Sequence, residues 1–485
     1  MRPSLSAKEE SVPEKNVTAT EKGRENNRVE DRKVAPQHSQ NGAGRYLPFF
    51  LVCTYLLLGA RFFGLIRQYA VNVLFWDQWD FDDATVFQHH SLWEMFRWEH
   101  APHRQGLGAL LQKLIEPWIH WNGRYEAFGI GAIIFSAAVL ALLLKVCLYG
   151  KISYSDVIIP LLFLTPLQYE TLVVTPNPAH GPLPLLLTVL YCLCWLIRSY
   201  RWKYICVLLL NFLLIYTGFG IFIGLVTPAL LALDYCANTR HLASRYQWGS
   251  AAALAISIAS LASFFVHYKF NPAVDCVSPA PKNPIMYLRF VALMFSSAAG
   301  LKVSSLALAT SVGSIALLLF FVGLLVTAKR LFAQSSDTWP RDAAIAALLV
   351  YCAVFCLNAA YGRLCLGLEG ATASRYTPYV VLGLFGLYLQ ALSNHGRNLR
   401  VPLVAVLLAF AMLGARPLNP TDAWSIGYYS NGKRAWRKCY LARHDIYACE
   451  ALTNFQIYPS PEATRLQEKL DFLERNHLNL YDNSQ

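Results

Sequence analysis

The chain has 485 residues, of which 55% are hydrophobic and 15% are charged, and its mean hydropathy is +0.34. About a quarter of the residues of a soluble protein are charged, so this composition excludes an ordinary soluble protein. The formal net charge of +12 does not indicate nucleic-acid binding, because the basic residues are scattered between apolar runs.

The first 45 residues are polar and contain almost no large apolar side chain. They lack the short apolar core and the small-residue cleavage site of a secretory signal peptide. Residues 1–45 are therefore expected to form a disordered cytoplasmic tail.

Apolar runs recur from Tyr46 to Ala415. Each has about 15 to 25 residues, the length that a helix needs to cross a hydrocarbon core. The pattern predicts an all-α polytopic membrane protein with about eleven transmembrane helices in residues 46–415. The predicted spans cover approximately residues 46–66, 127–148, 157–173, 183–197, two segments within 204–235, 249–266, 306–328, 343–360, 379–392 and 401–415.

The run 204–235 is too long for one span and short for two, and "TGFG" at 217–220 interrupts it. Two spans are preferred because they place Arg240 and Arg245 on the same side as the other basic loops. The amino terminus is then cytoplasmic, and the loop 67–125 and the segment 416–485 are external.

The first external loop begins with "FWDQWDFDDATVF", which contains four carboxylates: Asp77, Asp80, Asp82 and Asp83. A carboxylate beside a membrane can act as a general base. Several carboxylates together with histidines can hold a hard divalent cation such as Mg²⁺ or Mn²⁺, and carboxylates can also stabilise positive charge on a sugar ring. The alternative without a function is that they cap a helix that starts near Ala84. Asp82 and Asp83 fit capping better, whereas Asp77 and Asp80 lie between aromatic residues.

Later in the same loop, "WEHAPHR" brings together an acid, two imidazoles and a guanidinium. The residues are Glu99, His100, His103 and Arg104. They lie between two predicted interfacial helices, "SLWEMFRW" and "GLGALLQKLIEPWIHW".

A first span followed by a large external loop with acidic residues close to the membrane resembles the GT-C superfamily of polytopic glycosyltransferases. These enzymes take a sugar from a polyprenyl-phosphate donor on the outer face of the membrane. More narrowly, "WDQWDF", "WEHAPHRQGL" and "GRLCLGLEGATASRYTPY" resemble three motifs that recur in this order in a group of bacterial inner-membrane proteins.

The resemblance implies that Asp77 is the catalytic base, with Asp80 as its close rival. It also implies that Glu99, His103 and Arg104 shape the donor or acceptor site. The middle motif of the group reads more like Asn-Glu-His-Arg, so the "APHRQ" insertion leaves both His100 and His103 open for its histidine.

The loop after the ninth predicted span contains Arg363, Arg375 and Tyr376. A guanidinium binds phosphate with two parallel hydrogen bonds and stabilises the charge that grows on a leaving phosphate. We expect these residues to bind the donor phosphate. The alternative for Arg375 is that it reaches the interface or pairs with Glu369. His180, in the hairpin "TPNPAHGP", is expected to be a satisfied loop histidine.

Residues 416–485 have the composition of a soluble segment, expected to cap the active-site cavity or help bind the acceptor. Cys439 and Cys449 are its only cysteines, and an external position predicts a disulfide between them. A helix is expected within "PEATRLQEKLDFLERNHL", with Leu466, Leu470 and Leu473 on its packing face.

The sequence therefore predicts a bacterial inner-membrane glycosyltransferase that moves a sugar from a polyprenyl-phosphate donor to an external glycan or lipid-linked acceptor. One alternative is a polysaccharide polymerase, ligase or flippase, and another is a non-enzymatic scaffold. A flippase needs charged groups inside its spans, and there are few, because Lys145 and Arg61 lie near span ends where they can snorkel.

Overall fold

The computed structural model describes residues 45–82, 91–100, 103–238, 244–269, 284–333, 338–394, 396–462 and 465–482. Residues 1–45 form a unit separate from residues 46–485, and the fold below is that of the second unit. The predicted tail (except Arg45), Asp83 and the predicted helix start at Ala84 lie outside the described residues.

The second unit consists almost entirely of helices, with one pair of two-residue strands in its described part. In chain order the α-helices and strands are α1 (Leu47–Tyr69), α2 (Asp77–Asp82), α3 (Leu92–Phe96), β1 (Glu99–His100), β2 (His103–Arg104), α4 (Gly106–Ile119), α5 (Gly123–Tyr149), α6 (Ile158–Phe163), α7 (Pro182–Cys194), α8 (Tyr200–Ile215), α9 (Ile221–Asn238), α10 (Ser244–Phe264), α12 (Ile285–Ser297), α13 (Leu306–Ala333), α14 (Trp339–Arg363), α15 (Thr377–Ser393), α16 (Arg397–Gly414), α17 (Pro420–Arg443), α18 (Ile446–Thr453) and α19 (Leu466–Arg475).

Six helical segments in the described part of the chain are long and apolar enough to cross a membrane. They cover residues 47–69, 123–149, 218–236, 247–264, 303–333 and 339–366. Four further apolar helices, at residues 154–168, 182–194, 285–297 and 398–414, are shorter. The predicted mostly helical fold is confirmed, and the described residues hold six candidate membrane spans by length and composition, while the count of about eleven stays a prediction.

Helix ends follow local sequence signals. Asn122 precedes α5, and its side-chain oxygen accepts hydrogen bonds from the backbone N–H groups of Arg124 (3.0 Å) and Tyr125 (3.4 Å). Gly150 ends the same helix with a φ of 71°, which a residue without Cβ adopts at little cost. The first long helix after the external loop is therefore bounded where its sequence indicates.

The predicted third span, 157–173, is not one continuous helix. The helix α6 ends at Phe163, a 3-10 turn follows at Pro166–Gln168, and a π-helical turn covers Glu170–Val174. Proline has no N–H to continue a helix, which explains the break before Pro166. The interruption has a consequence for the site, because Glu170 is the first residue of the π-helical turn.

The predicted break at "TGFG" is confirmed. The helix α8 ends at Ile215, and α9 begins at Ile221. Between them Gly218 has a φ of 52°, and a Cβ at this position would lie 2.3 Å from the carbonyl oxygen of Ala179. Only glycine allows this approach to the "TPNPAHGP" hairpin.

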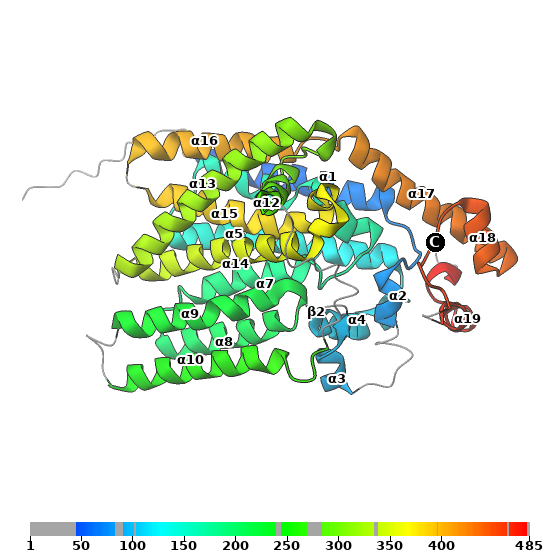
Figure 1. Cartoon of the computed structure of the whole chain (residues 1–485), viewed down its shortest axis with the longest axis horizontal. Helices are drawn as coiled ribbons and strands as arrows, with labels where there is room; N and C mark the ends of the chain where they lie inside the picture. Colours follow the sequence, from blue (N-terminus) through cyan, green and yellow to red (C-terminus); the bar gives the residue numbers. More distant parts are fainter. Residues whose placement is uncertain are drawn as a thin grey trace, which may run out of the picture. The chain divides into compact units, whose positions relative to one another are not determined.

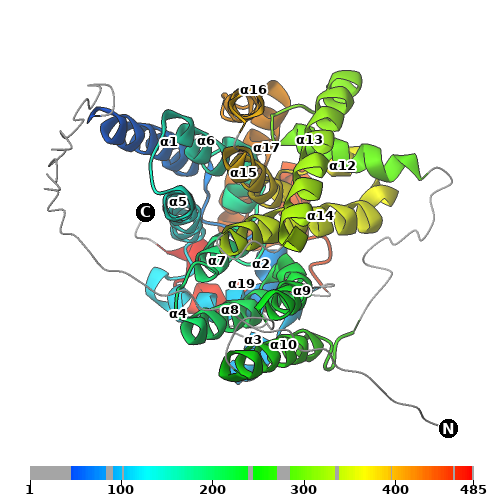
Figure 2. The same ribbon diagram turned by 90° about the vertical axis from the view of Figure 1, so that its left-hand side faces the viewer.

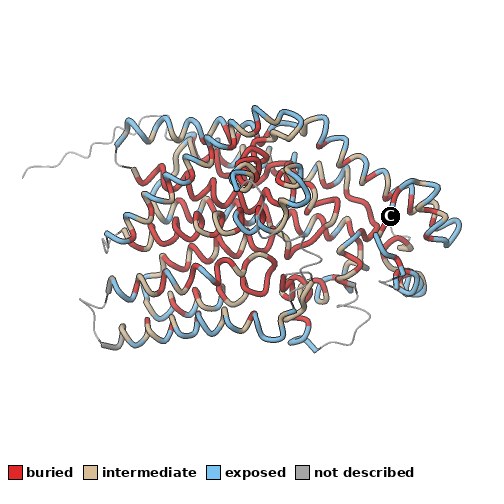
Figure 3. Tube along the Cα trace, viewed as in Figure 1, coloured by how far each residue is buried: buried red, intermediate tan, exposed pale blue. Residues whose placement is uncertain are grey.

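The long helices lie alongside one another, and Figure 1 shows that α2, α3, α4 and the carboxy-terminal helices α17–α19 gather at one end of them. Figure 2 shows the same bundle along its helices, with α7, α14 and α15 in its interior. Buried residues follow these inner helices, whereas α10 and α16 present exposed residues outward (Figure 3). The polar segments that the sequence places outside the membrane are therefore collected at one end.

The expected snorkelling of Lys145 is wrong. Its side chain is buried, and its ammonium donates to Asp156 Oδ2 at 2.6 Å and to the carbonyl oxygen of Lys151 at 2.8 Å. Arg61 donates to the carbonyl oxygens of Ala415 and Arg416. Both cations are neutralised or solvated by the protein itself, which makes them structural groups.

The carboxy-terminal segment packs on α2. Leu466, Leu470 and Leu473 are buried, as the helical spacing predicts. The ammonium of Lys469 donates to the carbonyl oxygen of Trp79 at 2.6 Å, and the backbone N–H of Trp76 donates to Ile457 O at 3.2 Å. The segment thus fixes the stretch that carries the aspartates.

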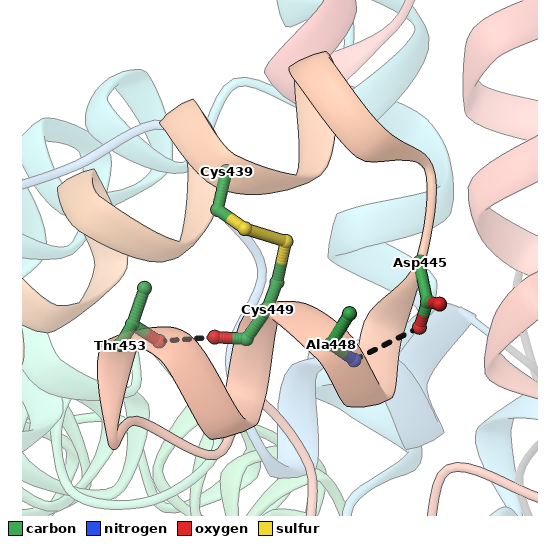
Figure 4. Close-up of a disulfide and its surroundings, with 5 residues drawn as sticks. All are labelled: Cys439, Asp445, Ala448, Cys449 and Thr453. Atoms are coloured by element: carbon green, nitrogen blue, oxygen red, sulfur yellow. Dashed lines mark hydrogen bonds between the residues drawn. A yellow bond between two sulfur atoms is a disulfide. The ribbon is translucent and has the colours of Figure 1, made fainter.

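The predicted disulfide joins Cys439 in α17 to Cys449 in α18 (Figure 4). Asp445 caps α18 by accepting a 2.9 Å hydrogen bond from Ala448 N, which orients the second cysteine. We expect non-reducing mass spectrometry of the purified protein to recover the two cysteines in one linked peptide. Closure of a 10-residue separation stabilises the fold by roughly 2 to 3 kcal/mol. Two thiols that alkylate readily without reductant would contradict this pairing.

Topology yields a second prediction. Reporter fusions at Ser335, which lies outside the described residues, and at Asn454, which follows α18, should report the cytoplasmic and the external side respectively. The physical reason is the positive-inside distribution of Lys and Arg in the short loops. The same side for both fusions would show that the predicted orientation is wrong.

Candidate active site

The aspartates are presented by a sharp turn and a short helix. Trp76 has a φ of 50° and ends the extended segment that follows α1. The helix α2 starts at Asp77, so Asp77 and Asp80 lie three residues apart on the same face. Gln78 fixes the turn, because its side chain accepts from Phe75 N at 3.1 Å and donates to Glu126 Oε2 at 2.7 Å.

The hairpin that the short strands β1 and β2 form brings one histidine close to these aspartates. In the pairing of β1 with β2, His100 lies opposite His103, and Glu99 lies opposite Arg104. His100 Nε2 is 3.8 Å from Asp77 Oδ1, and its Nδ1 is 3.7 Å from Asp80 Oδ2. Of the two histidines that the sequence leaves open, His100 therefore joins the carboxylates.

Asp77, Asp80 and His100 form a carboxylate–imidazole triad, in which one ligand atom from each residue lies within 4.8 Å of the others. Two carboxylate oxygens and one imidazole nitrogen are a donor set that suits Mn²⁺ or Zn²⁺ better than Mg²⁺, which prefers oxygen ligands. The three residues can hold a divalent cation, the combination of carboxylates and histidine that the sequence suggests for such a site.

The two carboxyl groups have different environments. Burial raises the pKa of Asp77, but the hydrogen bond and charge of His100, together with the charges of His180 and Arg375, hold this pKa below its usual range. Burial raises the pKa of Asp80 above its usual range, against the charge of His100 and a 3.1 Å hydrogen bond from the Tyr458 hydroxyl. Asp77 therefore stays ionised to a lower pH than Asp80 does.

From the sequence, Trp76 and Trp79 would be expected to limit the access of solvent to Asp77 and raise its basicity, but its pKa lies below the usual range. Trp79 is fully buried in the main core, and the Trp76 side chain is 45% exposed. Asp77 is 39% exposed, so it is accessible to a ligand. The charged groups around Asp77 together outweigh the effect of its burial on the pKa.

His100 has a pKa above its usual range. Burial lowers it, but the hydrogen bond to Asp77 and the charges of Asp77 and Asp80 outweigh this effect. The triad therefore holds a proton on its imidazole more readily than an isolated histidine does.

Arg375 lies close enough for its charge to act on Asp77, although 298 residues (375 − 77) separate them. Its carboxylate partner is Glu170 at 3.1 Å, and not Glu369. The charge of Glu170 raises the pKa of Arg375, and 43% of the arginine side chain is exposed. One of its terminal nitrogens is used by Glu170, so further donors are available to a ligand.

The other two residues expected at the donor phosphate differ in position. Tyr376 is buried, with the Arg375 guanidinium 5.8 Å from its ring centroid. Arg363 ends α14, and its positive charge acts on His103 and His180. The charges of both arginines therefore reach the same cluster of histidines.

His103 and His180 lie next to each other, with ring centroids 5.4 Å apart. The ring centroids of His103 and Phe219 are 4.1 Å apart. The Nε2 atom of His180 is 2.9 Å from Nε2 of Gln105. Burial lowers the pKa of His180 to about 4, and it lowers that of His103 well below its usual value. Both are neutral near pH 7, which fits the expectation of a satisfied histidine at position 180.

Arg104 is held by backbone carbonyls. Its guanidinium donates to the carbonyl oxygens of Phe264 (2.8 Å), Val266 (2.7 Å) and Arg97 (2.5 Å), and only 3% of the residue is exposed. Glu99 lies 4.0 Å away and accepts from Lys269 N at 3.2 Å. These two residues tie the hairpin to the end of α10 and do not touch the aspartates.

We therefore expect Arg104→Gln to destabilise the protein. Three carbonyl oxygens lose a charged donor, a loss of about 2 to 4 kcal/mol. The measurement is the apparent melting temperature of the purified protein in detergent, with exposed Arg443→Gln as the control. An unchanged melting temperature for Arg104→Gln would show that these hydrogen bonds contribute no stability.

Several residues around the aspartates were not predicted from the sequence: Glu170, Tyr458, Lys469, Gln105 and Phe219. Glu170 alone carried a signal, because a single acid within an apolar run is unusual in a membrane segment.

A comparison of the chain with protein-family models, curated proteins and solved structures finds no match.

Proposed function

We propose that the protein is a membrane glycosyltransferase that moves a sugar from a polyprenyl-phosphate donor to an external glycan or lipid-linked acceptor. One observation carries the proposal. The accessible carboxylate of Asp77, on α2, and the guanidinium of Arg375, in the turn before α15, come from distant parts of the sequence, and the charge of each shifts the pKa of the other. Transfer of a sugar from a phosphate requires a base and an anion-binding group together.

Asp77 is the general base in this proposal. Its carboxylate takes the proton of the acceptor hydroxyl while the acceptor oxygen forms a bond to the anomeric carbon of the sugar. The bond between that carbon and the donor phosphate oxygen breaks, and polyprenyl phosphate leaves with the electron pair. The neighbouring His100 stabilises the ionised form of Asp77 before the acceptor binds.

Arg375 stabilises the leaving phosphate. Negative charge on that group increases as the sugar bond breaks, so a fixed guanidinium stabilises the transition state more than the ground state. Glu170 orients the side chain by accepting from both its backbone N–H (3.2 Å) and its terminal nitrogen (3.1 Å). Tyr376 and Arg363 complete the proposed donor side.

A divalent cation is a second component that the triad can hold. Asp80 and His100 would be its ligands together with Asp77, and the cation would supply positive charge for phosphate or hydroxyl oxygens. When the base and the ion share Asp77, only one of its oxygens remains for the acceptor.

The proposed setting is a bacterial inner membrane, with a GT-C-like arrangement of about eleven spans and the site on the periplasmic side. Two features at the site end support an oxidising compartment. Cys439 and Cys449 are joined, and Cys365, just after α14, is also disulfide-bonded.

The experiment is a mass comparison of surface glycans from cells with the gene present, deleted and restored. We expect deletion to remove a fixed mass that equals one sugar residue, or a repeat of it, and restoration to return it. Identical glycans in all three strains would contradict the proposed function.

A further inference from the structure

A second polar site lies between α1, α5 and α17. It is a pocket of about 470 Å³, a volume within the range of small-ligand pockets. Its polar lining consists of Arg67, Asn72, Arg124, Arg434, Arg437 and Lys438. Among the described residues that line it, none is Asp or Glu.

The geometry of α17 shows that the pocket is separate from the triad of Asp77, Asp80 and His100. Arg434, Arg437 and Lys438 recur at the i, i+3 and i+4 spacing of one helix face, and Leu441 continues that face into the pocket. Lys433 points the other way, because its ammonium is buried and donates to Val174 O at 2.5 Å. One helix therefore separates the cationic pocket from the side of the fold that holds Glu170.

Two of the cations are held in place by the protein. Arg434 donates to the carbonyl oxygen of Gln68 at 2.8 Å, at the end of α1. Arg437 donates to the carbonyl oxygen of Leu480 at 2.9 Å, and the charge of Asp482 acts on it. These carbonyls orient the guanidiniums but neutralise little of their charge.

The other three cations are not paired. No hydrogen bond or ion pair joins the side chains of Arg67, Arg124 and Lys438 to any residue in the described part of the chain, and Arg67 and Lys438 are exposed. Five like charges around one pocket repel one another unless an anion lies between them. The arrangement also opposes the usual bias of Lys and Arg toward the cytoplasmic side.

The position of the pocket indicates what kind of anion it takes. Arg67 lies in the last turn of α1, and Arg124 lies in the first turn of α5. Both helices are long and apolar enough to cross a membrane, so their ends lie at the depth of lipid headgroups. Arginine forks match the oxygens of a phosphate, and an acyl chain can follow the exposed apolar surface of α1.

We propose that this pocket binds the phosphate of an anionic lipid headgroup from the outer leaflet. The inference does not depend on the proposed transfer reaction, but the choice of the outer leaflet rests on the proposed external orientation of this end. The bound lipid would join α1, α5 and α17 by neutralising the charges that meet there, and so stabilise the segment that carries Asp77.

The test uses the full chain purified in detergent and titrated with short-chain phosphatidylglycerol, with the melting temperature as readout. We expect saturable stabilisation of the wild type. The triple variant Arg67→Gln, Arg124→Gln, Lys438→Gln should bind at least about tenfold more weakly, because three charge-assisted contacts are lost. A matched triple, Arg416→Gln, Arg443→Gln, Arg475→Gln, removes the same charge elsewhere and should bind like the wild type.

Two other probes separate the sources of the phosphate. Equal stabilisation by short-chain phosphatidylcholine would overturn the proposal, because that headgroup has no net charge. Equal stabilisation by inorganic phosphate at the same concentrations would overturn the assignment to a lipid. If the triple variant does not fold, the exposed single variant Lys438→Gln replaces it, and wild-type affinity in that variant would count against the site.

Discussion

Asp77→Asn is expected to abolish sugar transfer while the protein is made and folded at the wild-type level. The substitution keeps the shape of the side chain but removes the ionised oxygen that takes the acceptor proton. Loss of a general base lowers the rate by about 10²- to 10⁴-fold. The measurement is glycan modification in a deletion strain that is complemented with each variant.

Two companion variants test whether the effect is specific to Asp77 among the neighbouring aspartates. Asp80→Asn removes the carboxylate with the raised pKa, which the Tyr458 hydroxyl and His100 contact. We expect a smaller loss than for Asp77→Asn if Asp80 orients the acceptor or holds a cation. Asp82→Asn should lose little, as expected for a residue whose role is to cap a helix. Wild-type transfer by Asp77→Asn, with no transfer by Asp80→Asn, would identify Asp80 as the base.

Arg375→Lys is expected to be impaired nearly as strongly as Arg375→Ala. The proposed role uses the planar fork of the guanidinium, which meets two phosphate oxygens and one carboxylate at the same time. A lysine retains the charge but cannot make this set of contacts, so its transfer rate should fall by about 10²-fold or more. The rate is measured at saturating acceptor with membranes from the same complemented strain.

The variant Glu170→Gln tests separately whether Glu170 acts by orienting Arg375 or by its negative charge. The amide still accepts a hydrogen bond from Arg375 but carries no negative charge, so the arginine keeps its position and becomes more available to phosphate. We expect this variant to retain more transfer activity than Arg375→Lys. Full activity of Arg375→Lys would show that the planar guanidinium is not needed, and position 375 would then have only an electrostatic role or no role in transfer.

The fold was predictable where one apolar run makes one helix. The run after the external loop produced α5, and "TGFG" produced the break between α8 and α9, because a tight turn against another backbone needs glycine. The prediction was wrong at 157–173, where the run is mostly apolar and the prolines are the signal for the interruption of the helix. Hydropathy measures transfer to lipid and does not detect a break in backbone hydrogen bonding.

The candidate site was predictable only where its residues are close together in the sequence. The sequence singled out Asp77 and Asp80 among the four aspartates, but it predicted a helix only from about Ala84, whereas α2 already starts at Asp77. The choice of His100 over His103 depends on the register of a two-residue hairpin, and an insertion in the motif hid it. Glu170 and Tyr458 reach the site through packing between segments more than 200 residues apart, which no local pattern encodes.

The central claim is that Asp77 supports transfer of a sugar from a lipid carrier, and one measurement tests it most directly. In cells that carry the deletion and are complemented with wild type or Asp77→Asn, both the polyprenyl-phosphate sugars and the surface glycans are quantified by mass spectrometry. The proposed mechanism predicts that Asp77→Asn cells lack a sugar residue in the glycan and accumulate the same sugar on the lipid carrier. Equal amounts of both species in Asp77→Asn and wild-type cells would contradict it.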